Sequence, residues 1–117
     1  MTKPARGEIW AVCFDPAVGE EMKKVRPALV VQENGLGKLE LTIVVPITDW
    51  KERYSDFPWH TKLDLSESNG LEKESSADAL QVKSVSHERC LRRIGFVSSM
   101  ELENVAAAVA LCVGYSP

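Results

Sequence analysis

The polar side chains best suited to chemistry stand at the ends of expected β-strands. They are Arg26, Thr48, His60, Gln81 and Lys83. Arg26 offers a permanently charged, planar fork that matches phosphate oxygens, and Pro27 after it keeps its backbone extended. An arginine at a strand entrance can equally form a structural salt bridge, and the other four can be solvated strand residues. These residue types therefore indicate an anion-binding edge without deciding between packing and catalysis.

Other kinds of chemistry have little support in the sequence. The two histidines, His60 and His87, lie far apart, and no acidic cluster has the spacing of metal ligands. The chain contains no phosphate-cradling P-loop, no dinucleotide fingerprint and no nucleophile elbow. Cys13 lies in an apolar stretch and is expected in the core. We therefore expect a site without a metal or a cofactor.

Six short strands and one long helix are expected to position these residues. Alternating or β-rich segments between turn residues predict strands over residues 7–14, 26–32, 39–48, 58–65, 76–85 and 92–97. Short helical turns fit residues 49–56 and 86–91. The helix begins at a capping box formed by Ser98 and Glu101 and ends before Gly114. This pattern predicts a mainly β fold, in which one C-terminal helix covers a small, strongly bent antiparallel sheet.

Two strands have faces that matter for the site. In strand 39–48, a period of two places one set of side chains inward, namely Leu39, Leu41, Ile43, Val45 and Ile47. The other set lies on a more polar face and consists of Glu40, Thr42, Val44, Pro46 and Thr48. Pro46 predicts an edge or a bulge at the end of this strand. In strand 76–85, one face is expected to carry Leu80 and Val82, and the other Ala79, Gln81 and Lys83.

Length and composition limit the class of protein. At 117 residues the chain is expected to form one domain, residues 1–117, that buries a core without disulfides. A net charge of −3 argues against bulk attraction to nucleic acid but is compatible with a local basic site. Three widely spaced cysteines predict reduced thiols, and no segment resembles a membrane span or a signal peptide. We expect a cytoplasmic protein with no membrane partner.

Five sequence blocks recur in the order found in one protein family. They are RGEIW at residues 6–10, DPAVGEE at 15–21, RPALVV at 26–31, VPIT at 45–48, and QVKSV at 81–85 followed by Arg89 and Ile94-Gly95. Each block alone is modest, but together they span nearly the whole chain. The chain thereby resembles the MazF/PemK family of toxin endoribonucleases.

The resemblance implies both a fold and an activity. The fold is a small SH3-like barrel of the CcdB/MazF type with a C-terminal helix, usually present as a homodimer. The activity is metal-independent, sequence-specific cleavage of single-stranded RNA, inhibited by a cognate antitoxin whose disordered tail covers the RNA groove. The expected products carry a 2′,3′-cyclic phosphate and a 5′-hydroxyl. In the family, catalysis is tied to the arginine of the R-P motif and the threonine of the P-I-T motif, here Arg26 and Thr48.

The chain departs from the family pattern at three positions. Glu20 stands where some members have a histidine, Lys83 where the family has an arginine, and Leu80 where many have an aspartate. An activity would therefore depend on Arg26 and Thr48, with substrate contacts expected from Gln81, Lys83, Glu20, His60 and Trp50. His60 is also a candidate proton acceptor, and the aromatic residues around Trp50 could stack on bases or close the barrel end. The departures leave an alternative open, which is a non-catalytic binding module or a gyrase-poisoning toxin like the related CcdB family.

Overall fold

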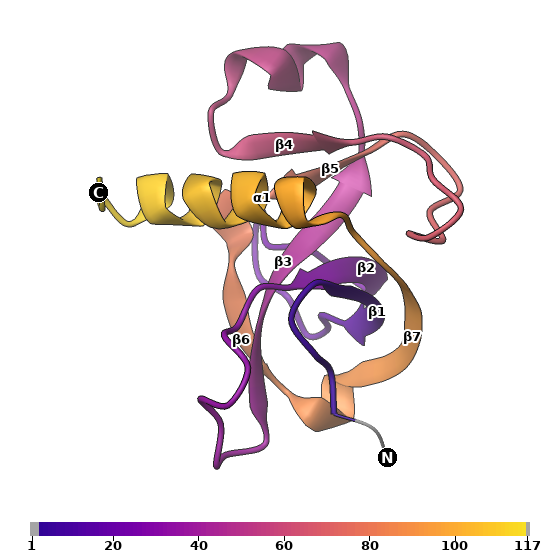
Figure 1. Cartoon of the computed structure of the whole chain (residues 1–117), viewed down its shortest axis with the longest axis vertical. Helices are drawn as coiled ribbons and strands as arrows, with labels where there is room; N and C mark the ends of the chain where they lie inside the picture. The colour runs from indigo at the N-terminus through magenta and orange to yellow at the C-terminus, as the bar shows by residue number, and fades with distance from the viewer. Residues whose placement is uncertain (1–2, 117) are drawn as a thin grey trace.

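The fold consists of one strongly bent antiparallel sheet with a helix across one face. The computed structural model describes residues 3–116. The strands are β1 (Glu8–Cys13), β2 (Val25–Val30), β3 (Leu41–Asp49), β4 (His60–Leu63), β5 (Ser75–Asp78), β6 (Lys83–Ser86) and β7 (Cys90–Phe96). The remaining elements are the 3-10 turns η1 (Glu52–Asp56), η2 (Ala79–Gln81) and η3 (His87–Arg89), and the helix α1 (Ser99–Cys112). Figure 1 shows α1 running beside β4, with η1 beyond β4 at the far end of the molecule.

The strand order confirms the predicted mainly β architecture. The strands follow the order β4-β5-β3-β2-β1-β7, and β6 pairs with β3 off this path. The pairs are antiparallel throughout. The outer strands β4 and β7 do not pair with each other, so the sheet of this SH3-like barrel is not closed.

β3 is the central strand, and it changes its partner along its length. Its first half pairs with β6, ending at Val44 opposite Lys83, and its last three residues pair with β5 from Ile47 onward. On its other side it pairs with β2, where Pro46 lies opposite Ala28. The expected edge or bulge at Pro46 is therefore wrong. Pro46 lies where the partner changes from β6 to β5, so its missing N–H breaks neither of these two ladders.

The sheet buries apolar side chains on both faces, which corrects the predicted faces of β3. One core contains Ile9, Leu29, Val45, Ile47, Leu63 and Val105, and the other contains Trp10, Val12, Phe14, Ala28, Val30, Val44 and Val85. Val45 and Ile47 face inward as predicted. Leu39, Leu41 and Ile43 are exposed, whereas Thr42, Val44 and Pro46 on the expected polar face are buried. The alternation was correct, but the face expected to be polar is the site of the second core.

The predicted strand over residues 76–85 is two strands separated by a turn. β5 ends at Asp78, whose carboxylate accepts a hydrogen bond from the Leu80 backbone N–H and caps η2. At this turn Ala79 is buried and Leu80 is 62% exposed. Residues Gln81 and Lys83 consequently lie on the turn and on β6 instead of on one continuous strand.

The C-terminal helix follows its predicted signals. Ser98 and Glu101 form the capping box, and Gly114 has a φ of 77°, the left-handed conformation expected of a helix terminator. α1 buries Val105 and Ala108 and packs against β4 and η2. Within residues 3–116, no helix combines the length and apolar character needed to cross a membrane. The cysteines are free thiols, and Cys13, expected in the core, is half-buried at the end of β1.

Candidate functional site

The two predicted catalytic residues lie where β2 and β3 separate. The ladder between these strands pairs Val30 with Val44 and ends where Ala28 pairs with Pro46. Arg26 and Thr48 are each two residues beyond this last pair, so their side chains leave the sheet on the same face. Arg26 remains paired with Val12 of β1, whereas Thr48 pairs with Ser76 of β5. Arg26 is exposed and Thr48 is half-buried. The structure therefore brings the predicted pair to neighbouring strand ends.

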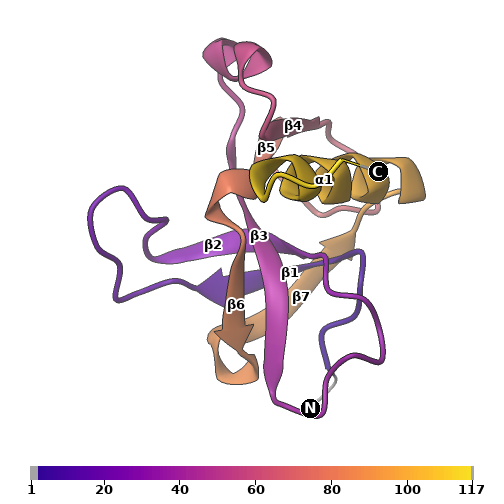
Figure 2. The same ribbon diagram turned by 90° about the vertical axis from the view of Figure 1, so that its left-hand side faces the viewer.

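A first cavity collects three of the predicted substrate contacts. It has a volume of about 650 Å³ and lies between the β1–β2 loop (residues 14–24) and the segment from η2 to β6. Glu20 of the loop, Gln81 of η2 and Lys83 of β6 line it, together with Pro46 and Asp78. Figure 2 shows the loop extending away from β1 and β2 on one side of the molecule. We call this space the loop cavity.

Gln81 connects the two walls of the loop cavity. Its Oε1 accepts a hydrogen bond of 2.5 Å from the Met22 backbone N–H, and its Nε2 donates one of 3.2 Å to Asp78. Asp78 is 9% exposed, and its other oxygen caps η2. A glutamine amide has two N–H donors and two acceptor lone pairs, so Gln81 retains one of each for a ligand. The sequence reasoning did not assign Asp78 a role, although a carboxylate directly before a turn is a recognisable capping signal.

The sheet opening beside Arg26 forms a second cavity. We call it the strand-end cavity. It has a volume of about 410 Å³ and lies between the start of β2, the end of β3 and residues 70–75. Its lining combines apolar and charged side chains, including Pro27, Leu71, Ile94, Arg26, Lys73 and Arg92, with the carboxylates of Asp49 and Glu72. Asp49 follows Thr48 in β3, so β3 presents Pro46 to the loop cavity and Asp49 to this one. Sequence reasoning missed Lys73 and Arg92.

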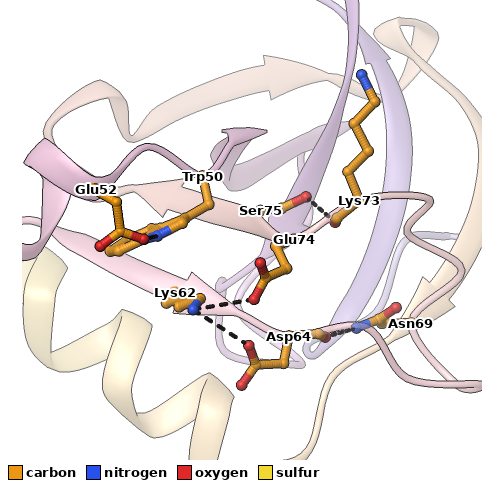
Figure 3. Close-up of polar contacts among 8 residues, drawn as sticks. All are labelled: Trp50, Glu52, Lys62, Asp64, Asn69, Lys73, Glu74 and Ser75. Carbon is orange, nitrogen blue, oxygen red and sulfur yellow. Dashed lines mark hydrogen bonds and ion pairs between the residues drawn. The ribbon is translucent and has the colours of Figure 1, made fainter.

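Two glycines allow the loop over residues 66–74 to build one wall of the strand-end cavity. A Cβ on Gly95 of β7 would lie 2.4 Å from the Ser68 carbonyl oxygen, and one on Gly70 would lie 2.5 Å from the Ile94 carbonyl oxygen. Buried Asn69 fixes the loop further, because its Nδ2 donates a hydrogen bond of 2.8 Å to the Asp64 carbonyl oxygen, as Figure 3 shows. This close approach explains the Ile94-Gly95 motif as a packing requirement.

His60 and Trp50 lie in an aromatic group over β4, outside the linings of both cavities. The His60 ring stacks on Tyr54 with centroids 3.8 Å apart, and its Nδ1 is 2.7 Å from the hydroxyl oxygen of buried Ser76. Burial lowers the pKa of His60 below its usual value, with a smaller opposing effect from the Asp78 carboxylate. The imidazole is therefore neutral at pH 7. Because Ser76 is the β5 partner of Thr48, one strand separates His60 from the predicted catalytic threonine.

Trp50 is held in place by charged neighbours. Its indole N–H donates a hydrogen bond of 3.1 Å to Glu52, and the Lys62 ammonium lies 5.3 Å from the ring centroid. Lys62 also pairs with Glu74 at 3.1 Å and with Asp64 at 3.9 Å (Figure 3). The hydrogen bond that Lys62 donates to the Glu74 carboxylate raises the pKa of Lys62, so this cation persists at neutral pH. Trp50 thus packs over the outer surface of β4, in contact with a fixed cation.

The comparisons with known proteins agree with the fold and the family expected from the sequence. The family model described as PemK-like, MazF-like toxin of type II toxin-antitoxin system matches residues 5–113. Endoribonuclease MazF9 of Mycobacterium tuberculosis is 38% identical over 113 residues, which cover 91% of this chain and 92% of that protein.

Solved structures give the same fold. MazF from Deinococcus radiodurans aligns with a TM-score of 0.79 at 21% identity, over 97% of this chain and 99% of that one. An endoribonuclease from a mycobacterial species, solved in complex with its cognate antitoxin, aligns with a TM-score of 0.77 at 16% identity, over 97% of this chain and 98% of that one. On the extent of the family match and the identity to the M. tuberculosis relative, the chain belongs to the PemK-like, MazF-like toxins of type II toxin–antitoxin systems.

Proposed function

We propose that this chain is a toxin endoribonuclease that cleaves single-stranded RNA at a short sequence without a metal ion. The observation that carries the proposal is the position of Arg26 and Thr48 at neighbouring strand ends, with Arg26 in the lining of the strand-end cavity. Membership of the toxin family and the similarity to an endoribonuclease of M. tuberculosis support the same reaction.

The proposed reaction uses the 2′-hydroxyl of the RNA as the nucleophile. Its oxygen gives up its proton to a general base and bonds to the neighbouring phosphorus, the bond from phosphorus to the 5′-oxygen breaks, and the 5′-oxygen takes up a proton. The products are a 2′,3′-cyclic phosphate and a 5′-hydroxyl. Arg26 supplies charge-assisted hydrogen bonds to the phosphate oxygens, whose negative charge grows in the transition state. Thr48 orients the 2′-hydroxyl or bonds a phosphate oxygen.

Substrate contacts are assigned to the surfaces beside this pair. Glu20, Gln81 and Lys83 line the loop cavity, where Lys83 supplies a positive charge and the other two supply hydrogen-bonding groups for unpaired base edges. Trp50 and His60 offer aromatic surfaces for stacking beyond β5. Neutral His60 also has the protonation state required of a general base.

The partners follow from the same proposal. The chain is expected to bind single-stranded RNA in the cytoplasm and to be neutralised by a cognate antitoxin that competes for the RNA-binding surface. A homodimer is also expected, for which the exposed apolar side chains of Leu39, Leu41 and Ile43 offer a physical basis. Sedimentation that shows only monomer at micromolar concentration would contradict the dimer.

One experiment tests the central proposal against the alternative. The purified protein is incubated with mixed single-stranded RNA in EDTA, beside a double variant carrying Arg26→Ala and Thr48→Ala. Discrete cuts by the wild type alone, with ends that carry a cyclic phosphate and a 5′-hydroxyl, support the proposal. Absence of cleavage, or equal cleavage by the double variant, contradicts it. Inhibition of gyrase supercoiling in place of RNA cleavage would instead identify a gyrase-poisoning toxin.

A further inference from the structure

The three arginines in and beside β7 have different surroundings. Arg89 donates hydrogen bonds to the carbonyl oxygens of Cys13 and Asp15 and so anchors the start of the β1–β2 loop. Arg93 pairs with Glu8 at 3.2 Å, and its guanidinium lies 5.8 Å from the Phe96 ring centroid. Arg92 is exposed and has no carboxylate within 4 Å among residues 3–116. Of the three, Arg92 alone lines the strand-end cavity.

The strand register explains why neighbouring arginines differ. Arg92 is paired with Ala11, and Ala11 is paired with Pro27, so these three residues form a row across β7, β1 and β2 on one face. Arg93 is paired with Trp10 and shares the opposite face with Glu8. Alternation therefore directs Arg92 to the cavity and Arg93 to an internal ion pair.

The cavity that Arg92 enters has the chemistry of a nucleotide site. Within the strand-end cavity, Lys73 is paired with Asp49 at 3.6 Å. The other charged groups of the cavity are Arg26, Arg92 and one carboxylate, Glu72. The apolar part of the lining, with Leu71 and Ile94, suits the face of a base or a ribose. Its volume of about 410 Å³ lies within the range of sites for small organic ligands.

We propose that Arg92 binds an RNA phosphate that flanks the scissile phosphate at Arg26. This inference rests on the proposed function and adds a second phosphate contact to it. A planar guanidinium without a protein partner keeps its donors for phosphate oxygens. RNA is favoured over an acidic protein segment because Arg26, the residue assigned to the scissile phosphate, borders the same cavity at the open end of β2, although strand alternation starts its side chain on the face opposite Arg92. The strand would pass from the reacting phosphate into the strand-end cavity, with its sugar or base over the apolar lining.

The test measures binding separately from cleavage. The full-length protein is titrated with a single-stranded oligonucleotide in which every ribose is 2′-O-methylated, because this probe lacks the nucleophile and stays intact. Dissociation constants are measured at several salt concentrations for the wild type and for Arg92→Gln, Arg92→Lys and Arg93→Gln. Arg93→Gln is the matched control, since it removes the same charge from the same strand at a side chain that does not line the strand-end cavity.

A specific phosphate contact gives a defined pattern. Arg92→Gln is expected to weaken binding roughly tenfold at low salt and to make the slope of log K against log salt shallower by about 0.7, the value for one phosphate on a single strand. Arg92→Lys restores the slope because it keeps the charge, and Arg93→Gln leaves the slope unchanged. Circular dichroism melts verify that the variants are folded.

Other patterns overturn the inference. Equal losses for Arg92→Gln and Arg93→Gln would mean that only net charge matters. Unchanged RNA binding by Arg92→Gln, with weakened binding of a glutamate-rich peptide, would assign the cavity to an acidic protein segment instead. RNA cleavage by the wild type is measured in parallel, so that failure of the inference about Arg92 can be distinguished from failure of the proposed endoribonuclease function. If the wild type cleaves RNA and Arg92→Gln binds normally, only the inference fails, whereas a wild type that binds but never cleaves contradicts the proposed function.

Discussion

The loop cavity and the strand-end cavity differ in how their polar groups are held. In the loop cavity, Gln81 bonds both Asp78 and the β1–β2 loop, so its amide is partly occupied before any ligand arrives. In the strand-end cavity, Arg26 and Arg92 have no carboxylate within 4 Å in the described part of the chain. The difference indicates that hydrogen bonds within the protein hold the polar groups of the first cavity, whereas the two guanidinium groups of the second have no such carboxylate partner.

The largest expected effect distinguishes the strand ends from the loop cavity. Arg26→Ala should lower kcat for RNA cleavage by about 10²–10³-fold, because it removes a preorganised donor to the reacting phosphate. Lys83→Gln in the loop cavity should mainly raise KM, since a substrate contact present in both the ground state and the transition state changes binding alone. Steady-state cleavage of one RNA by both variants provides the comparison. Equal effects of the two variants on kcat would contradict the assignment of catalysis to Arg26 and of substrate binding alone to Lys83.

A second change acts on the strand-end cavity through its wall. Gly95→Ala places a Cβ 2.4 Å from the Ser68 carbonyl oxygen, and backbone must move to relieve this overlap. The expected cost is about 2–3 kcal/mol in the free energy of unfolding, measured by urea denaturation. Gly37→Ala is the control, because its nearest neighbour is the flexible end of Gln32 at 3.3 Å. If Gly95→Ala had the same urea unfolding free energy as the control, the 66–74 loop would not be packed as described.

A third change releases the β1–β2 loop. Gln81→Ala removes the acceptor of the Met22 N–H and one of the donors to buried Asp78, at an expected cost of about 1–2 kcal/mol. Trypsin cleavage after Lys23 and Lys24 should then accelerate about tenfold, because cleavage follows the open population of the loop. Gln32→Ala is the matched control, since that amide also accepts a backbone N–H, from Ile43, but in another loop. Unchanged proteolysis in Gln81→Ala would show that the loop is held by other contacts.

The elements that could be predicted from sequence are those specified by local signals. The capping box of Ser98 and the terminator Gly114 place both ends of α1, because each acts within a few residues. The faces of β3 could not be assigned from alternation alone, since Thr42 and Val44 face a second core built largely from β1 and β2. When both faces of a strand carry apolar residues, as in β3, only the tertiary structure shows which of these residues are covered by other elements and which are exposed.

The candidate site divides in a similar way. Arg26 and Thr48 were assigned through the resemblance to a family, and Pro27 gave a physical reason for an extended arginine at that position. Arg92 was missed because the strand pattern does not reveal which face meets a cavity, and that cavity is walled by residues 70–75, about twenty positions earlier in the chain. Tertiary packing determines the contacts between distant segments, and a local sequence pattern does not predict them.

The smallest expected effect is a change in the pH dependence of stability, and it involves His60 of the aromatic group that lines neither cavity. Burial lowers the pKa of His60 in the folded protein. At a pH near or below the usual histidine pKa, the unfolded chain therefore binds more protons at this position than the folded protein does. Stability should therefore fall as the pH decreases from 7.5 to 5.5, and His60→Gln should reduce this fall. His87→Gln, which changes the other histidine, serves as the control. Urea midpoints at the two pH values provide the measurement, and an equal fall in the wild type and in His60→Gln would show that the ring is free to accept a proton in the folded state. Such a result would show that burial does not lower the pKa of His60, and would remove burial as a support for this residue as the general base.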